Sequence, residues 1–182
     1  MLKKALLSVA AAAAFAGSAF CAELAGGEVA IGEPIEKNGM EIAAVYLAPI
    51  EMYPRGTDLA ASKADIHLEA DIHALKGNKN GFGEGDWIPY LQIAYRLENL
   101  STNKVVAEGK FMPMVAQDGP HYGANIAIEK KGHKVGKYRV TYIIENPEKS
   151  GFGRHMDKAT GVGEWFQAFP VSFEFNYKGT PK

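Results

Sequence analysis

The stretch from Asp65 to His73 constrains the fold of this chain more than any other. Every second position from Asp65 onward carries a carboxylate or an imidazole, and the positions between them are apolar. Because successive side chains of a strand point to opposite faces, this period of two predicts a half-buried β-strand. Like charges that share one strand face repel each other unless something compensates them. A face made only of possible metal ligands therefore indicates a bound cation.

Short alternating or apolar segments recur along the chain and predict about seven strands. They cover residues 40–50, 65–73, 87–98, 104–111, 125–128, 138–145 and 165–177. Turn-forming residues separate them, and no segment has a helical apolar stripe of ordinary length. The run 112–123 is expected to be a loop, because it contains Pro113 and Pro120. This pattern predicts an all-β fold, an antiparallel β-sandwich.

The first residues have the pattern of a secretory signal peptide. Lys3 and Lys4 precede a short Ala- and Leu-rich run, which small residues follow. We therefore expect a signal peptide over residues 1–22, a single domain over 23–182, and a periplasmic product. Cys21 raises the alternative of a lipoprotein, but the bulky Phe20 directly before it favours a product without a lipid anchor.

Composition narrows the chemistry of any metal site. Cys21 is the single cysteine, so a mature domain would have to bind metal through imidazole, thioether and carboxylate groups. The chain has a net charge of −1 and no Lys- and Arg-rich stripe with interleaved aromatic residues. Such a chain is not expected to bind nucleic acid.

Three segments carry the candidate ligands. His67 and Glu69 share the polar face of the predicted strand, Met114 precedes Asp118 and His121, and His155 lies in a Gly-rich stretch; the full set is His67, Glu69, Met114, Asp118, His121 and His155. Imidazole with thioether suits copper, whereas imidazole with carboxylate suits iron, manganese and zinc. The segments are far apart in sequence, and spacing alone does not show that they converge.

The same segments resemble those of a known family. Met40–Tyr46, Asp65–Asp71, Met112–Ala116, Asp118–Asn125 and Gly151–His155 are similar to stretches of the periplasmic high-affinity iron-transport proteins of bacterial pathogens. These are exported partners of an FTR-type iron permease and are related to a pathogen-specific membrane antigen. The resemblance covers roughly residues 27–182.

The resemblance implies a specific fold, site and role. It implies an immunoglobulin-like sandwich that forms a homodimer, with a metal site near the subunit interface, and a role in iron uptake with an inner-membrane iron permease. It implies copper ligands at His67, Met114, His121 and His155. Glu69 would be an additional or alternative ligand, and Asp118 a nearby carboxylate.

Other polar residues are expected to have supporting or structural roles. Asp65 and Asp71 could orient the imidazoles, and Met112 could replace Met114 if the loop register differs. His73 lies too far along the strand to share an ion with His67, and His133 is expected to be a solvated turn residue.

Three functions compete on the sequence alone. The leading hypothesis is a metal-binding protein, not an enzyme, that captures or transfers iron and also binds copper. The second is a copper-dependent ferrous-iron oxidase or a copper-handling protein of the periplasm. The third is an adhesion or interaction sandwich with incidental histidines, which predicts no stoichiometric metal.

Overall fold

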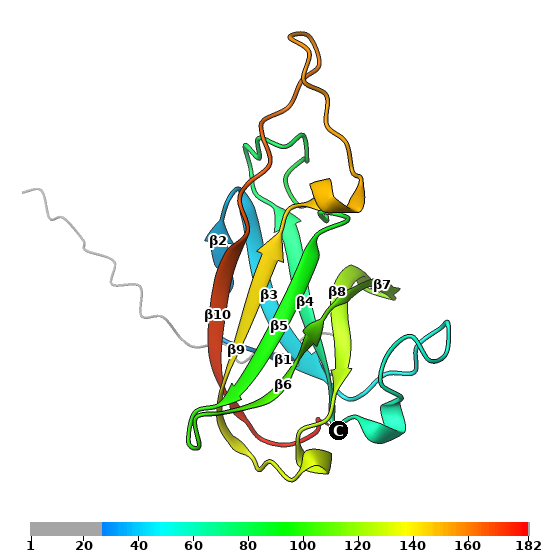
Figure 1. Ribbon diagram of the computed structural model, residues 1–182, viewed down its shortest axis with the longest axis vertical. Coiled ribbons are helices and arrows are strands. Elements are labelled where there is room, and N and C mark those ends of the chain that lie inside the picture. The colour runs from blue at the N-terminus through cyan, green and yellow to red at the C-terminus, as the bar shows by residue number, and fades with distance from the viewer. Residues whose placement is uncertain (1–26, 182) are drawn as a thin grey trace, which may run out of the picture.

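The computed structural model describes residues 27–181, which form two antiparallel β-sheets packed face to face (Figure 1). The first sheet has the order β1-β3-β4-β8-β7, with β2 also paired to β3; its strands are β1 Val29–Ala30, β2 Ile35–Lys37, β3 Met40–Leu47, β4 Ile66–Ala74, β7 Met112–Ala116 and β8 Gly119–Ile126. The second sheet has the order β10-β9-β5-β6; its strands are β5 Gln92–Asn99, β6 Lys104–Lys110, β9 Gly136–Glu145 and β10 Phe169–Tyr177.

The predicted all-β class and immunoglobulin-like antiparallel sandwich are confirmed. Within residues 27–181 the helical segments are short 3₁₀ turns: η1 Ala61–Lys63, η2 Glu129–Lys131 and η3 Pro147–Ser150. None of the helices in this range is long and apolar enough to cross a membrane. The predicted signal peptide, 1–22, lies outside the described residues.

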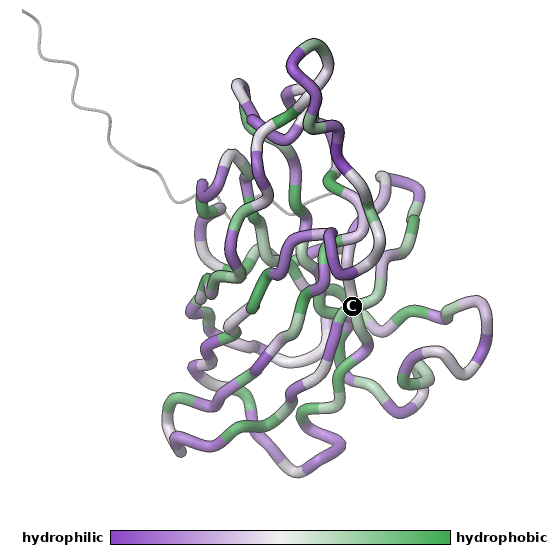
Figure 2. Tube along the Cα trace, turned by 45° about the horizontal axis from the view of Figure 1, so that its top comes forward, coloured by the Kyte–Doolittle hydropathy of each residue, from purple (hydrophilic) through white to green (hydrophobic). Residues whose placement is uncertain are grey.

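The core forms where the apolar faces of the two sheets meet. Hydrophobic and hydrophilic positions alternate along the strands in Figure 2. On β9 the inward positions are Tyr138, Val140, Tyr142 and Ile144, all of them buried. They pack against the inward positions of β4, which include Ile66 and Leu68, in one hydrophobic cluster. Burial of such side chains stabilises the sandwich by roughly 1.5–3 kcal/mol each.

The run 112–123 was wrongly predicted to be a loop. It forms most of a hairpin, β7 and β8, with Val115 opposite Pro120. Both prolines are tolerated for a physical reason. Pro113 is on β7, an edge strand that has no neighbour on its outer side. Pro120 lies beyond Tyr122, the last β8 residue paired with β4, so β4 does not need an N–H group from it.

Over residues 66–70, β4 is buried on both faces rather than on one, which corrects the prediction of a half-buried strand there; Asp71 and His73 are partly exposed. Its apolar face packs in the core, and its polar positions His67 and Glu69 are also buried. The segment between β3 and η1 lies against β8 at this face, because Ile50 and Leu59 both hydrogen-bond Asn125. Side chains on this covered face need partners other than water.

Candidate metal centre

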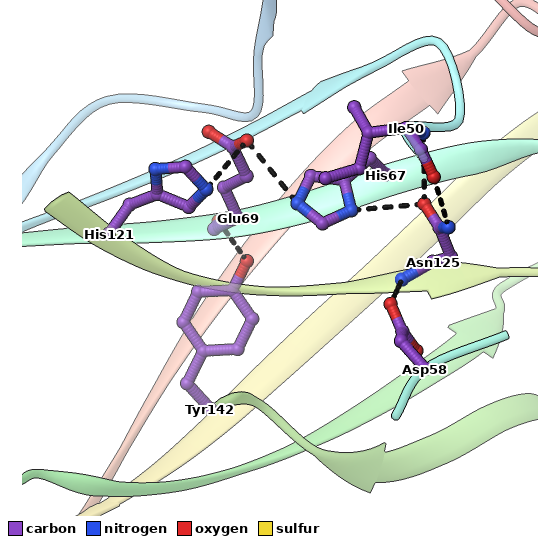
Figure 3. Close-up of polar contacts among 7 residues, drawn as sticks. All are labelled: Ile50, Asp58, His67, Glu69, His121, Asn125 and Tyr142. Atoms are coloured by element: carbon purple, nitrogen blue, oxygen red, sulfur yellow. Dashed lines mark hydrogen bonds and ion pairs between the residues drawn. The ribbon is translucent and has the colours of Figure 1, made fainter. Parts of the chain in front are cut away.

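Three side chains from β4 and β8 converge on the outer face of the first sheet. Glu69 Oε1 lies 3.4 Å from His67 Nε2 and 3.2 Å from His121 Nε2. One ligand atom from each residue lies within 4.8 Å of the others. Figure 3 shows the Glu69 carboxylate between the two imidazole rings. The sheet register explains this convergence across 54 positions of sequence, because Glu69 lies opposite Gly123, two residues from His121.

The two imidazole nitrogens that face Glu69 have no hydrogen-bond partner. Both Nε2 atoms are buried, and neither contact with the Glu69 carboxylate has hydrogen-bond geometry. The residues themselves are 0%, 5% and 4% exposed for His67, Glu69 and His121. Buried polar atoms are nearly always satisfied in folded proteins. Two unpaired nitrogens converging beside a carboxylate oxygen are the arrangement that a metal ion would satisfy.

Gly123 makes room for the His67 ring. A Cβ atom added at this glycine would lie 2.6 Å from His67 Nε2 and 3.1 Å from the carbonyl oxygen of Leu68. Real Cβ atoms do not approach other atoms this closely, so an alanine here would have to displace the ring. The glycine therefore leaves the space that Nε2 of His67 occupies.

The electrostatics of the centre favour a cation. Burial, followed by the charges of Asp71, Glu28 and Asp118, raises the pKa of Glu69 to about 8. Burial, followed by the charges of Asp71 and Asp118, raises the pKa of Glu28 to about 7, and burial also raises that of Asp71. Several carboxyl groups thus share a partly dry site in which a positive charge would relieve their mutual repulsion.

The His67 imidazole is held neutral. Burial lowers its pKa to about 4, with the neighbouring His121 acting in the same direction and the hydrogen bond to Asn125 opposing them. A neutral imidazole is the form that binds metal ions. His67 therefore offers a lone pair at neutral pH without first losing a proton.

The centre opens into a cavity of about 990 Å³. Glu69 and His121 line it together with Met114 and Asp118, two further residues predicted from the sequence. Met114 lies directly opposite His121 in the β7–β8 hairpin. Met112, the possible replacement for Met114, also lines it. So do two residues that the sequence did not suggest, Glu28 and Met52. Glu28 precedes a strand of two residues, and Met52 lies between Pro49 and Pro54, so neither stands in a recognisable pattern.

His155 lies apart from the other predicted ligands. It is exposed, its Nδ1 lies 2.9 Å from Thr160 Oγ1, and it does not belong to the buried cluster. It stands on the projecting segment between η3 and β10, drawn in orange in Figure 1. One copy of the chain therefore assembles the histidines of β4 and β8 but does not bring His155 to them.

Of the residues expected to support the ligands, one lies beside the centre and others have contacts elsewhere. Asp71 lies close enough to influence the pKa of Glu69. Asp65 instead accepts hydrogen bonds from the backbone N–H groups of Ile128 and Lys130 at η2, so its expected role beside the imidazoles is wrong. His73 forms an isolated backbone bridge with Trp87.

Comparison with known proteins places the chain among iron-transport proteins. A family model described as Fe²⁺ transport protein matches residues 25–179. A UPF0423 protein of Brucella abortus is 51% identical over 158 residues, which are 85% of this chain and 84% of the relative. The 34 kDa membrane antigen of Treponema pallidum is 39% identical over 157 residues, which are 84% of this chain and 75% of the antigen.

Two solved structures are similar along nearly the whole described part of the chain. Copper-reconstituted P19 from Campylobacter jejuni has a TM-score of 0.84 and 67% identity, covering 86% of this chain and 100% of P19. FetP of uropathogenic Escherichia coli strain F11 has a TM-score of 0.79 and 60% identity, covering 84% of this chain and 97% of FetP. Together with the extent of the family match, this similarity shows that the chain belongs to the Fe²⁺ transport protein family.

Proposed function

We propose that this protein binds a metal ion through His67, Glu69 and His121 and captures or transfers metal during high-affinity iron uptake. The observation that carries this proposal is the pair of buried, unpaired Nε2 atoms beside one carboxylate oxygen. Membership of the Fe²⁺ transport protein family supports the iron-uptake role. The same membership supports a binding and transport protein.

Copper and iron are the proposed ligand metals. Imidazole and the Met114 thioether suit copper, and the carboxylates of Glu69, Asp118 and Glu28 suit a harder ion such as Fe²⁺. Copper-reconstituted P19, at 67% identity, supports copper binding by this chain. Manganese and zinc are expected to bind in vitro, because imidazole and carboxylate donors suit them as well.

We propose that the protein acts as a homodimer in which His155 of one copy completes the centre of the other. His155 is exposed on a projecting segment, whereas the cavity beside His121 is open. Tyr53 and Val115, exposed at 90% and 77%, both line that cavity and would be covered by a second copy. A measured monomer that still binds metal with full affinity would contradict this arrangement.

The proposed location and partner follow from the expected signal peptide and the family. Export through residues 1–22 would place a single domain, 23–182, in the periplasm, where an FTR-type inner-membrane permease would receive iron. A deletion strain is expected to grow poorly under iron restriction. Normal growth under that restriction would count against the transport role.

A second candidate function is copper-dependent oxidation of ferrous iron. It is favoured by one observation, the presence of thioether, imidazole and carboxylate groups in a single cavity, which could hold the two metals near each other. Copper-loaded protein should then oxidise Fe²⁺ under air faster than the same amount of free copper. Equal rates would reject this function.

The direct test of the metal site is His121→Ala. Loss of one of three clustered ligands should lower Cu²⁺ or Zn²⁺ affinity by at least about a hundredfold, as measured by titration calorimetry. His133→Ala is the matched control, because it removes a histidine from the turn after η2, outside the cluster. Unchanged metal content in purified His121→Ala would overturn the proposed site.

A further inference from the structure

The side chain of Asn125 makes four hydrogen bonds beside the metal centre. It lies on β8, is buried, and stands opposite His67 in the sheet register. Its Nδ2 donates to the carbonyl oxygens of Ile50 at 2.8 Å and Leu59 at 2.7 Å. Its Oδ1 lies 3.2 Å from the donating N–H of Ile50 and 3.1 Å from His67 Nδ1 (Figure 3). Both ends of the amide are thus fully used.

These contacts determine which way the amide faces. The group that points at the Ile50 and Leu59 carbonyls must be the NH₂, since an oxygen there would face two acceptors without a hydrogen. The N–H of Ile50 independently requires an oxygen at the other end. The carbonyl oxygen of Asn125 therefore faces His67.

The orientation of the amide in turn determines the tautomer of His67. An amide oxygen only accepts hydrogen bonds, so His67 Nδ1 must carry the proton and donate it. In a neutral imidazole the other nitrogen then has a lone pair. That nitrogen is Nε2, which faces Glu69 and His121. The hydrogen bond thus leaves the correct atom free for a metal.

The same residue holds the cavity wall in place. We call residues 48–60 the wall segment; it includes Ile50 and Met52, which line the cavity. Asn125 binds this segment at Ile50 and Leu59, and its backbone N–H donates to Asp58 Oδ2 at 2.7 Å. One side chain therefore contacts both a proposed metal ligand and the segment that covers it.

We propose that Asn125 is a positioning residue that holds His67 in its metal-binding tautomer and couples that ring to the wall segment. The inference rests on the proposed metal site, but Asn125 itself does not touch the metal. Metal binding at His67 strengthens the Nδ1–H as a donor, because coordination withdraws electrons from the ring. Order in the wall segment and occupancy of the centre are therefore linked through this amide.

The first experiment is NMR of the full chain with ¹⁵N-labelled histidine, before and after addition of Zn²⁺. We expect His67 to have the Nδ1–H tautomer in the metal-free protein, with Zn²⁺ shifting the Nε2 resonance. A metal-free protein with the proton on Nε2 would overturn the inference. This readout does not need metal, so it separates the inference from the proposed function, which fails if the wild-type chain binds no Zn²⁺ or Cu²⁺.

Two variants separate the two contacts of Asn125. Asn125→Leu removes both and should weaken Zn²⁺ binding by about 10- to 100-fold, the usual effect of losing a ligand-orienting hydrogen bond. Asn125→Asp keeps an acceptor for His67 Nδ1 but turns an oxygen toward the Ile50 and Leu59 carbonyls. It should therefore retain the Nδ1–H tautomer while amide hydrogen exchange in the wall segment becomes faster.

A matched control and the Asp variant keep the proposal testable even if Asn125→Leu does not fold. Asn146→Leu removes another asparagine that bridges two segments, through Phe166 O and Glu148 N, away from the centre. Its Zn²⁺ affinity should equal that of the wild type. Equal affinity in folded Asn125→Leu, or unchanged wall-segment exchange in Asn125→Asp, would overturn the coupling.

Discussion

The outer faces of the two sheets are both polar, but their residues and their exposure to solvent differ. On the second sheet, Arg139 of β9 pairs with Glu174 of β10, and Thr141 and Ser172 hydrogen-bond at 2.8 Å, all open to solvent. On the first sheet, His67 and Glu69 of β4 and His121 of β8 are buried, and the Nε2 atoms of the two histidines are unpaired. Polarity on a strand is therefore no guide to function by itself.

Two properties together separate a ligand-binding face from a solvated one. The open face satisfies its groups by complementary cross-strand pairs and by water. The covered face holds mainly acids and imidazoles. Burial first, and neighbouring carboxylates second, raise the pKa values of Glu69 and the nearby Glu28. Burial without internal partners is costly, and this cost is what an incoming metal would remove.

The largest expected effect comes from filling the space under His67. Gly123→Ala places a Cβ where the ring lies, so we expect metal affinity to fall at least about a hundredfold, or about 3 kcal/mol. Titration calorimetry with Cu²⁺ measures this. Gly153→Ala is the control, since a Cβ there would meet nothing within 4 Å. A Gly123→Ala protein with wild-type affinity would show that the ring position is not critical.

The second-largest expected effect is that the folding stability of the metal-free protein depends on pH. The folded-state pKa values of Glu28 and Glu69 are raised, so between pH 4.5 and 8 the folded chain binds more protons than the unfolded one, and its stability falls as pH rises. The lowered pKa of His67 acts oppositely, but only between about 4 and 6.5. From pH 6.5 to 8 we expect a loss of roughly 1 kcal/mol, chiefly from the buried Glu69, because solvent screens the more exposed Glu28.

Denaturant unfolding at several pH values measures this loss, and two variants assign it. Glu69→Gln should flatten the slope between pH 6.5 and 8. Glu174→Gln, on the open face, should leave it as in the wild type. A saturating metal should reverse the trend, because metal and protons compete for Glu69. Stability that rises through this range without metal would contradict the electrostatic account.

A smaller change is expected at the thioether. Met114→Leu conserves volume in the cavity but removes the soft donor opposite His121. Copper(I) affinity should fall about tenfold, while Zn²⁺ affinity should change much less. Competition with a chromophoric chelator measures both. An equal loss for the two metals would indicate a packing effect instead of coordination.

The smallest effect is expected on the open face. Arg139→Ala breaks the exposed pair with Glu174 and should cost no more than about 1 kcal/mol. Metal affinity should not change. A larger loss in denaturant unfolding would mean that the two outer faces differ less in their energetics than their structures indicate.

Local pattern predicted much of the sandwich, and pairing explains what it missed. The period of two was sufficient for β4, β9 and β10, because their inward residues are consistently apolar. It failed for β7 and β8, where Pro113 and Pro120 indicate a loop. Pro113 is compatible with a strand because β7 is at the edge of the sheet, and Pro120 because β4 and β8 stop pairing at Tyr122. Both are properties of the assembled sheet.

The candidate site was predictable in part for the same reason. His67 and Glu69 follow from one strand, since alternation places them on one face. Their meeting with His121 depends on the β4–β8 register. Glu28 and Met52 come to the cavity from segments without a periodic pattern. The roles of Met114 and Asp118 as ligands, and that of His155 from a second copy, remain predictions for experiment.

The acidic cavity also has a consequence for rates. A concave site with apolar walls and carboxylates such as Asp118 and Glu69 concentrates its electric field toward its floor. Such a field draws small cations inward faster than diffusion to a neutral site would allow, and dissolved salt weakens it. Protonation of Glu28 and Glu69 weakens it too. Metal should therefore be collected fastest in dilute, mildly alkaline surroundings, where both carboxylates are charged, and more slowly as the medium becomes saline or acidic.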